Sequence, residues 1–163
     1  MARGRSAGAT PATVALERAG VAFTRHSYAH DPAAASYGLE AAEALGLDPA
    51  AVFKTLLAEL DARLVVGIVP VTGQLDLKAL AAALGGKRAV MAEPAVAERT
   101  TGYVVGGISP IGQKKRLSTV LDASALEQAR IYVSGGKRGL DLGLDPRDLV
   151  RLLDAEVARI GRP

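Results

Sequence analysis

The chain has 163 residues, a length that suits one domain with a sizeable core. Hydrophobic residues make up 49% of it, which excludes a disordered chain, and aromatic residues only 4%, so we expect a core of Ala, Leu and Val. The net charge of +3 is smaller than that of a dedicated nucleic-acid clamp. The absence of cysteine excludes disulfides, zinc–thiolate sites and a cysteine nucleophile.

The elements predicted for the first half of the chain begin with a helix over 11–20. Thr10 and Pro11 are typical of a helix start, and Gly20 of a helix end. The pattern then predicts a strand over 21–28, a helix over 36–45, strands over 52–58 and 64–69 joined by a turn at 61–62, and a helix over 76–84.

The second half is predicted to contain strands over 88–91, 102–105, 117–121, 130–134 and 140–142, and helices over 94–99 and 145–158. Several strands are joined by hairpins, so we expect an α+β domain with a mixed, mostly antiparallel sheet and packed helices. We expect this single compact domain over 10–163, preceded by a flexible basic tail at 1–9. No run of about 18 apolar residues exists, so no membrane-spanning helix is predicted.

Lys54 is the most informative single residue. It interrupts an apolar strand, where side chains alternate, so it shares a face with Val52, Leu56 and Ala58. A lysine on this face either protects an exposed sheet edge or points into a cavity that receives an anionic ligand. The strand by itself leaves both interpretations open.

Two glycine-rich loops and an acid accompany Lys54. The loop at 106–110 (GGISP) has adjacent glycines, whose N–H groups can approach a ligand closely and stabilise an oxyanion. The loop at 134–139 (SGGKRG) offers a hydroxyl and N–H groups, and Asp141 follows it. These features predict a polar pocket for a small anionic or carbonyl-bearing ligand. Basic side chains that could make weak contacts with phosphates are Lys114, Lys115, Lys137 and Arg138.

The sequence does not match the motifs that are typical of several other enzyme classes. Gln113 stands where a P-loop would need lysine, and the chain has no dinucleotide fingerprint after a strand and no G-x-S-x-G elbow. His26 and His30 lie in a predicted strand and turn, where their spacing favours a structural pair over a metal site. We therefore expect neither a metal nor a cofactor.

Four runs strongly resemble the YbaK/EbsC family of trans-editing aminoacyl-tRNA deacylases, which are related to the editing domain of prolyl-tRNA synthetase. The resemblance covers about residues 10–158 and implies a compact α+β fold with a partly barrel-like sheet surrounded by helices. The runs are VFKTL (52–56), PVTGQLDLK (70–78), TGYVVGGISPIGQKKR (101–116) and IYVSGGKRGLD (131–141).

The resemblance implies hydrolysis of mischarged Cys-tRNA(Pro), with Cys-tRNA(Cys) as a further candidate, in the cytoplasm and in a transient complex with prolyl-tRNA synthetase. A pocket that accepts proline cannot strongly reject cysteine, so a second hydrolytic site is needed. The alternatives are a deacylase for another small amino acid, such as Ala-tRNA(Pro), and a non-catalytic module that binds the aminoacyl end. The attacking group is either a positioned water or the thiol of the substrate itself.

The resemblance also implies roles for individual residues. Tyr37 occupies a position where relatives are expected to carry phenylalanine, which leaves the fine substrate preference open. The predicted catalytic residues are Lys54, Gly106 and Gly107, and the predicted substrate-binding residues are Tyr28, Tyr37, Thr55, Ile108, Ser109, Pro110, Ser134, Gly135 and Asp141.

Overall fold

The computed structural model describes residues 9–34 and 36–163, so the predicted tail at 1–9 lies outside the described residues except for Ala9. In the part of the chain that is described, no helix is long and apolar enough to cross a membrane. The helices are α1 (Pro11–Ala19), α2 (Tyr37–Leu45), α3 (Leu77–Ala83), α4 (Pro94–Thr101) and α5 (Pro146–Leu153), with short 3-10 helices η2 (Pro49–Ala51) and η3 (Ala123–Glu127).

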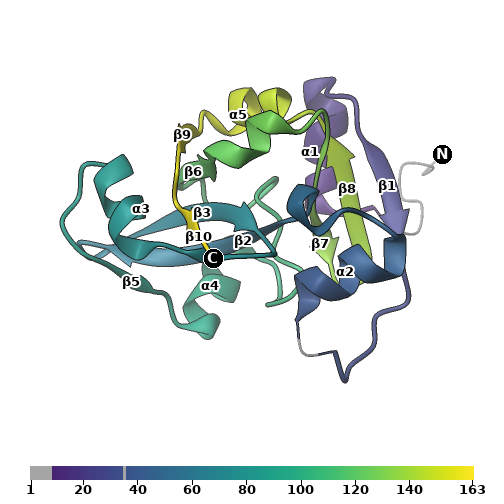
Figure 1. Ribbon diagram of the computed structural model, residues 1–163, viewed down its shortest axis with the longest axis horizontal. Helices are drawn as coiled ribbons and strands as arrows, with labels where there is room; N and C mark the ends of the chain where they lie inside the picture. The colour runs from purple at the N-terminus through teal and green to yellow at the C-terminus, as the bar shows by residue number, and fades with distance from the viewer. Residues whose placement is uncertain (1–8, 35) are drawn as a thin grey trace.

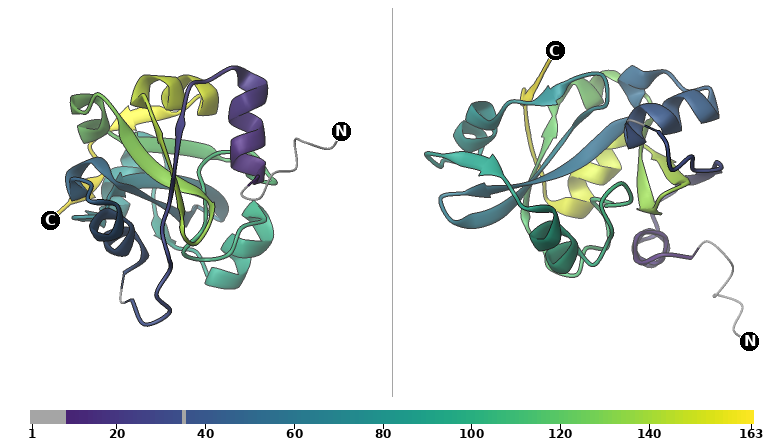
Figure 2. Two further views of the ribbon diagram at one scale, coloured as in Figure 1. Left: turned by 90° about the vertical axis from the view of Figure 1, so that its right-hand side faces the viewer. Right: turned by 90° about the horizontal axis from the view of Figure 1, so that it is seen from below.

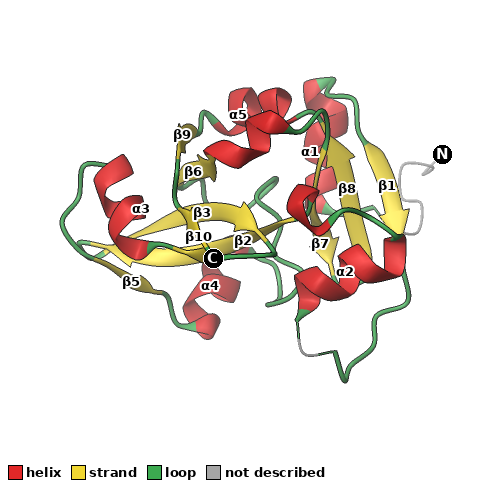
Figure 3. Ribbon diagram, in the orientation of Figure 1, coloured by secondary structure: helices red, strands yellow, loops and turns green. Residues whose placement is uncertain are grey.

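The strands form a five-stranded sheet in the order β5-β2-β3-β6-β9, a three-stranded sheet in the order β1-β8-β7, and the pair β10-β4 (Figures 1 and 3). Two strand pairs, β3–β6 and β6–β9, are parallel, and the other pairs are antiparallel. The strands are β1 (Thr24–Ser27), β2 (Phe53–Leu60), β3 (Arg63–Pro70), β4 (Gln74–Leu75), β5 (Ala89–Met91), β6 (Ser118–Asp122), β7 (Ile131–Lys137), β8 (Leu140–Leu144), β9 (Glu156–Ala158) and β10 (Gly161–Arg162).

This architecture confirms the predicted α+β class and the mixed, mostly antiparallel pairing. The sheets remain open, so the sheet that was predicted to be partly barrel-like does not form a closed barrel. The three-stranded sheet and α1 lie at the opposite end of the molecule from α3 and β5 (Figures 1 and 2).

Alternation along β3 divides the core into two parts. Val66 and Ile68 face a cluster that joins both sheets to α1, α4 and α5. Val65 and Val69 face the opposite side, where α3 packs. In β2 the same alternation sends Leu57 to the first cluster, and places Lys54 on the opposite face of the strand.

Two predicted elements are wrong. Residues 102–105 do not form a strand, because Gly102 caps α4 with a positive φ of 83° and the chain then makes tight turns that lead into the glycine loop. The last helix ends at Leu153 instead of continuing to 158, because Asp154 adopts the left-handed conformation and 156–158 pair with β6. The strand predicted over 21–28 is shortened to 24–27.

Candidate active site

A cavity of about 370 Å³ is lined by residues of both main sheets and of helices α2 and α4. It lies along an edge of β2 that has no neighbouring strand, because β5 pairs only with 58–60. The last bond on this edge runs from the N–H of Ala92 to the carbonyl of Leu57, at 3.1 Å. Since backbone groups point alternately to the two sides of a strand, the N–H and C=O of Thr55 face the open edge.

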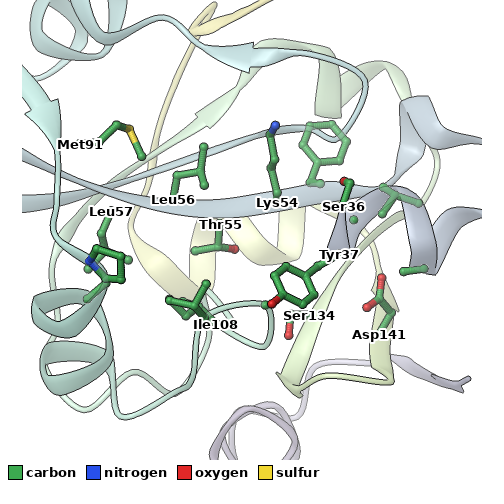
Figure 4. Close-up of a pocket in the computed structure, with 18 of the residues that line it drawn as sticks. Ser36, Tyr37, Lys54, Thr55, Leu56, Leu57, Met91, Ile108, Ser134 and Asp141 are labelled. Carbon is green, nitrogen blue, oxygen red and sulfur yellow. The ribbon is translucent and has the colours of Figure 1, made fainter. Parts of the chain in front are cut away.

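The cavity unites predicted site residues that are far apart in the sequence (Figure 4). Its walls are mainly apolar. Lys54 is the one basic side chain and Asp141 the one carboxylate among the described residues that line it. The predicted residues found in the lining are Tyr28, Tyr37, Lys54, Thr55, Gly106, Ile108, Ser134 and Asp141.

Four other predicted residues do not line the cavity. Gly107 donates its N–H to the carbonyl of Val104 at 2.8 Å, so this amide is not free to bind an oxyanion. The Oγ of Ser109 accepts the N–H of Ile111, and Ser109 is fully buried. Pro110 lines a separate, smaller cavity, and Gly135 is packed against Leu140.

Lys54 and Leu56 point to one side of β2, whereas Thr55 and Leu57 point to the other side, toward Ile108 (Figure 4). Lys54 is partly buried, and burial lowers the pKa of its ammonium group. No hydrogen bond or ion pair joins it to another of the described residues. The ammonium is therefore available to an anionic group that enters the cavity.

The hydroxyl of Thr55 is buried and has no hydrogen-bond partner among the residues that the structure describes. An unpaired buried hydroxyl is costly, by about 1–3 kcal/mol. Because Thr55 lines the cavity, a polar group of a bound ligand would remove this cost.

Asp141 is only 6% exposed, and burial raises the pKa of its carboxyl group to about 7. It lies opposite Ser134 on β7 and opposite His26 on β1. The pKa of Tyr28 is raised, first by burial and then by the charge of Asp141. A buried carboxyl group without a cation beside it is suited to receive a cationic group from a ligand.

Ser134 and the two histidines, which could serve as nucleophile or base, are each held by a contact within the described part of the chain. Ser134 Oγ accepts the N–H of Gly136 at 3.1 Å. His26 contacts the hydroxyl of Thr24 at 2.7 Å, and His30 contacts Glu40 at 2.8 Å. The two histidines thus have separate structural partners, and within 9–34 and 36–163 no three His, Asp or Glu side chains are grouped to hold a metal.

Gly106 forms the turn that closes one side of the cavity. Its φ is +89°, and a Cβ atom at this position would meet the ring of Tyr37 at 2.8 Å. Both constraints require glycine. The N–H of Gly106 has no backbone acceptor among the described residues.

The four basic side chains predicted to contact phosphates are exposed. Within the described part of the chain, Lys114, Lys115 and Lys137 make no side-chain hydrogen bond or ion pair. Arg138 donates two hydrogen bonds to the carbonyl of Val105. The exposed positions leave the lysines accessible to a polyanion.

The sequence did not identify most of the apolar wall. Met91, on the short edge strand β5, is 48% exposed in the structure, which the sequence does not indicate. The lining residues that were not predicted are Ser36, Gly38, Ala41, Val52, Phe53, Leu56, Leu57, Met91, Ala92, Pro94, Ala97 and Val105.

Comparisons with known proteins identify a family and relatives of this chain. The aminoacyl-tRNA editing domain family matches residues 31–152. The chain is 41% identical over 120 residues, 73% of each protein, to EbsC of Enterococcus faecalis, which is named as a candidate Cys-tRNA(Pro)/Cys-tRNA(Cys) deacylase. It is 31% identical over 99 residues to the multifunctional Ser/Thr-tRNA deacylase ProXp-y of Escherichia coli K12, covering 60% of this chain and 59% of that protein.

Solved structures extend the likeness to nearly the whole chain. One is described as a candidate trans-editing enzyme for prolyl-tRNA synthetase. It superimposes with a TM-score of 0.81 at 25% identity and covers 97% of this chain and 99% of its own.

Proposed function

The chain belongs to the aminoacyl-tRNA editing domain family, and from this premise we propose that it deacylates mischarged Cys-tRNA(Pro) in trans, with Cys-tRNA(Cys) as a second substrate. We assign this activity to one editing domain over 10–163. The observation that carries the proposal is the cavity, whose mainly apolar lining includes Lys54, the buried carboxyl group of Asp141 and the Gly106 turn.

The carboxylate of Asp141 is proposed to bind the α-ammonium of the aminoacyl group. Burial disfavours the charged carboxylate in the empty cavity, and an incoming ammonium restores it by placing an opposite charge nearby. The hydroxyl of Thr55 supplies a further polar contact for the ligand. The apolar walls then receive a small side chain such as that of cysteine.

The N–H of Gly106 is proposed to stabilise the oxyanion that forms on the ester carbonyl. Lys54 lies on the other side of β2 and is proposed to hold the 3′-terminal nucleotide through its phosphate, or the negative charge that develops during the reaction (Figure 4). Its pKa is lowered only by partial burial, so an ammonium that binds anions is favoured over a general base.

The attacking group is proposed to be the thiol of the substrate. The sulfur would bond to the ester carbonyl carbon, the bond to the ribose oxygen would break, and that oxygen would take the proton. A water held in the cavity is the alternative. The thiol is favoured because Ser134 and the histidines have structural partners, and no nucleophile–base hydrogen bond is found among the described residues that line the cavity.

A panel of tRNAs tests the function. Purified protein in excess should deacylate Cys-tRNA(Pro) and Cys-tRNA(Cys) quickly and leave Pro-tRNA(Pro) intact. If the thiol attacks, the serine and alanine esters of tRNA(Pro) should react at least about 10²-fold more slowly, because only an intramolecular nucleophile has so high an effective concentration.

Other results of this panel would replace parts of the proposal. Equal rates for the cysteine and serine esters would exclude thiol attack and favour a positioned water, in line with the relative named as a Ser/Thr-tRNA deacylase. Rapid loss of the alanine ester alone would change the substrate. Tight binding without turnover of any ester would make the chain a binding module.

Substitution of Gly106 by alanine tests the proposed oxyanion donor. The added Cβ would collide with Tyr37 and disfavour the positive φ, so the N–H should leave its position and the deacylation rate should fall by about 10²-fold. Gly85→Ala is the matched control, because Gly85 also has a positive φ, of 70°, but open space around it and no part in the cavity. An equal loss of rate in both variants would contradict the role of Gly106.

Prolyl-tRNA synthetase is proposed as a transient partner that supplies specificity for the tRNA, in the cytoplasm where the synthetase acts. The basis is the small charge of the chain, +3, since scattered exposed lysines bind nucleic acid weakly and without sequence preference. Lys114, Lys115 and Lys137 are proposed to make these weak phosphate contacts.

A further inference from the structure

Residues 104–107 form a β-turn whose middle peptide can take two orientations. The N–H of Gly107 donates to the carbonyl of Val104, and the φ of +89° at Gly106 identifies a type II turn. Type I and type II turns differ by a flip of the peptide between the two central residues, here Val105 and Gly106. The flip exchanges the directions of the Val105 carbonyl and the Gly106 N–H.

Arg138 binds one of these two groups directly. Its Nε and Nη2 atoms donate to the carbonyl oxygen of Val105 at 2.9 and 2.6 Å. Arg138 itself does not line the cavity, whereas Val105 and Gly106 do. The described residues contain no cis peptide bond, so in this peptide the N–H points opposite to the carbonyl and away from Arg138.

We propose that Arg138 is a positioning residue that holds the Val105–Gly106 peptide in the orientation in which the Gly106 N–H faces the substrate. This inference rests on the proposed deacylase function. The guanidinium also polarises the peptide, because a charged donor on the carbonyl makes the N–H of the same peptide a stronger donor. In the flipped turn, a carbonyl oxygen would face the developing oxyanion and repel it.

The surrounding contacts support a fixed turn. Glu98 on α4 accepts the N–H of Val105 at 2.8 Å, which holds the preceding peptide. The guanidinium carbon of Arg138 lies 5.0 Å from the ring centre of Tyr37, and that ring covers Gly106. Arg138 therefore joins α2 to the glycine turn from outside the cavity. A guanidinium suits this position better than an ammonium, because its planar fork can donate twice to one oxygen.

The test must separate positioning from the simpler possibility that Arg138 contacts a tRNA phosphate. Arg138→Met and Arg138→Lys are compared with wild type on two substrates: Cys-tRNA(Pro), and a 3′-cysteinyl adenosine ester that carries no phosphate. Arg63→Met, an exposed arginine on β3 that does not line the cavity, is the control for loss of one positive charge. Rates are measured with enzyme in excess, so that the rate at saturation and the half-saturating concentration are obtained separately.

If Arg138 positions the peptide, Arg138→Met should lower the saturating rate by about 10²-fold on both substrates. The half-saturating concentration and its dependence on salt should change little, and Arg138→Lys should restore only part of the rate. Unchanged rates on the phosphate-free ester, with weaker and less salt-dependent tRNA binding, would overturn the proposal in favour of a phosphate contact. If wild type itself deacylates neither substrate, the proposed function fails instead.

A second readout needs no activity. Amide hydrogen exchange and the ¹⁵N–¹H shifts of Gly106 and Gly107, measured by NMR on free protein, report the turn. Arg138→Met should move the Gly106 signal strongly and leave those of the Asp61–Ala62 hairpin unchanged, which also shows that the variant is folded. A Gly106 signal identical to that of wild type would contradict the proposal.

Discussion

Replacing Lys54 with alanine is expected to lower the rate of Cys-tRNA(Pro) deacylation by about 10²-fold or more while the fold remains intact. Lys54 is the one basic side chain among the described residues that line the cavity, and its ammonium makes no hydrogen bond or ion pair with any of them. Removal of its ammonium therefore costs no internal contact. The expected loss of deacylation rate comes from the anionic group of the substrate that the variant no longer binds.

The fold and the rate are measured separately for this variant. The melting temperature of Lys54→Ala should equal or exceed that of wild type, because burial of the ammonium is itself unfavourable. Lys78→Ala is the matched control, since Lys78 is exposed on α3 and lies outside the cavity lining. Near-full activity of Lys54→Ala would remove Lys54 from the mechanism.

Replacing Asp141 with asparagine is expected to stabilise the free protein and to impair its activity. The carboxyl group ionises near pH 3.8 in the unfolded chain but only at about 7 in the folded protein. The folded state thus holds a proton that the unfolded state has released, so stability falls as the pH rises from about 4 to about 7. Above pH 7 the cost is complete, on the order of 4 kcal/mol.

Denaturant unfolding of wild type and Asp141→Asn at pH 4 and pH 8 measures this effect. The two proteins should have similar stability at pH 4, and the variant should be more stable at pH 8. Deacylation by the variant should fall by about 10²-fold, because the neutral amide cannot pair with the α-ammonium. Equal stability of the two proteins at pH 8, together with unchanged activity, would show that the charge of Asp141 neither destabilises the free protein nor contributes to deacylation.

The opposite signs of these two effects have a common cause. A charged group that burial destabilises in the free protein is a candidate for pairing with a charged group of a ligand. The unpaired hydroxyl of Thr55 in the same cavity follows this pattern. A site built only for stability would satisfy such groups internally.

The sequence predicted the candidate site residues that are unusual for the segment in which they stand. Lys54 is detectable because a cation in an apolar strand is unusual, and Gly106 because adjacent glycines suggest a close backbone approach. Asp141 stands directly after the second glycine-rich loop, and the family resemblance then supplied Tyr28 and Tyr37, which local pattern alone does not connect.

The sequence could not show which polar groups are already hydrogen-bonded within the folded protein. Nothing local indicates that the N–H of Gly107 is bonded to Val104, or that Arg138 turns inward to the carbonyl of Val105. The apolar wall from α2 and α4 was missed for a similar reason, since such residues look like ordinary core. Strand β9 was predicted as helix because its pairing with β6 is a long-range contact.

The most direct test of the central claim is the deacylation of Cys-tRNA(Pro) by the purified wild-type protein in excess, with Pro-tRNA(Pro) as the reference substrate. We predict rapid loss of the cysteine ester and a rate for the proline ester equal to that in buffer alone. If the cysteine ester decays no faster than in buffer, the protein is not a Cys-tRNA(Pro) deacylase, however tightly it binds the tRNA.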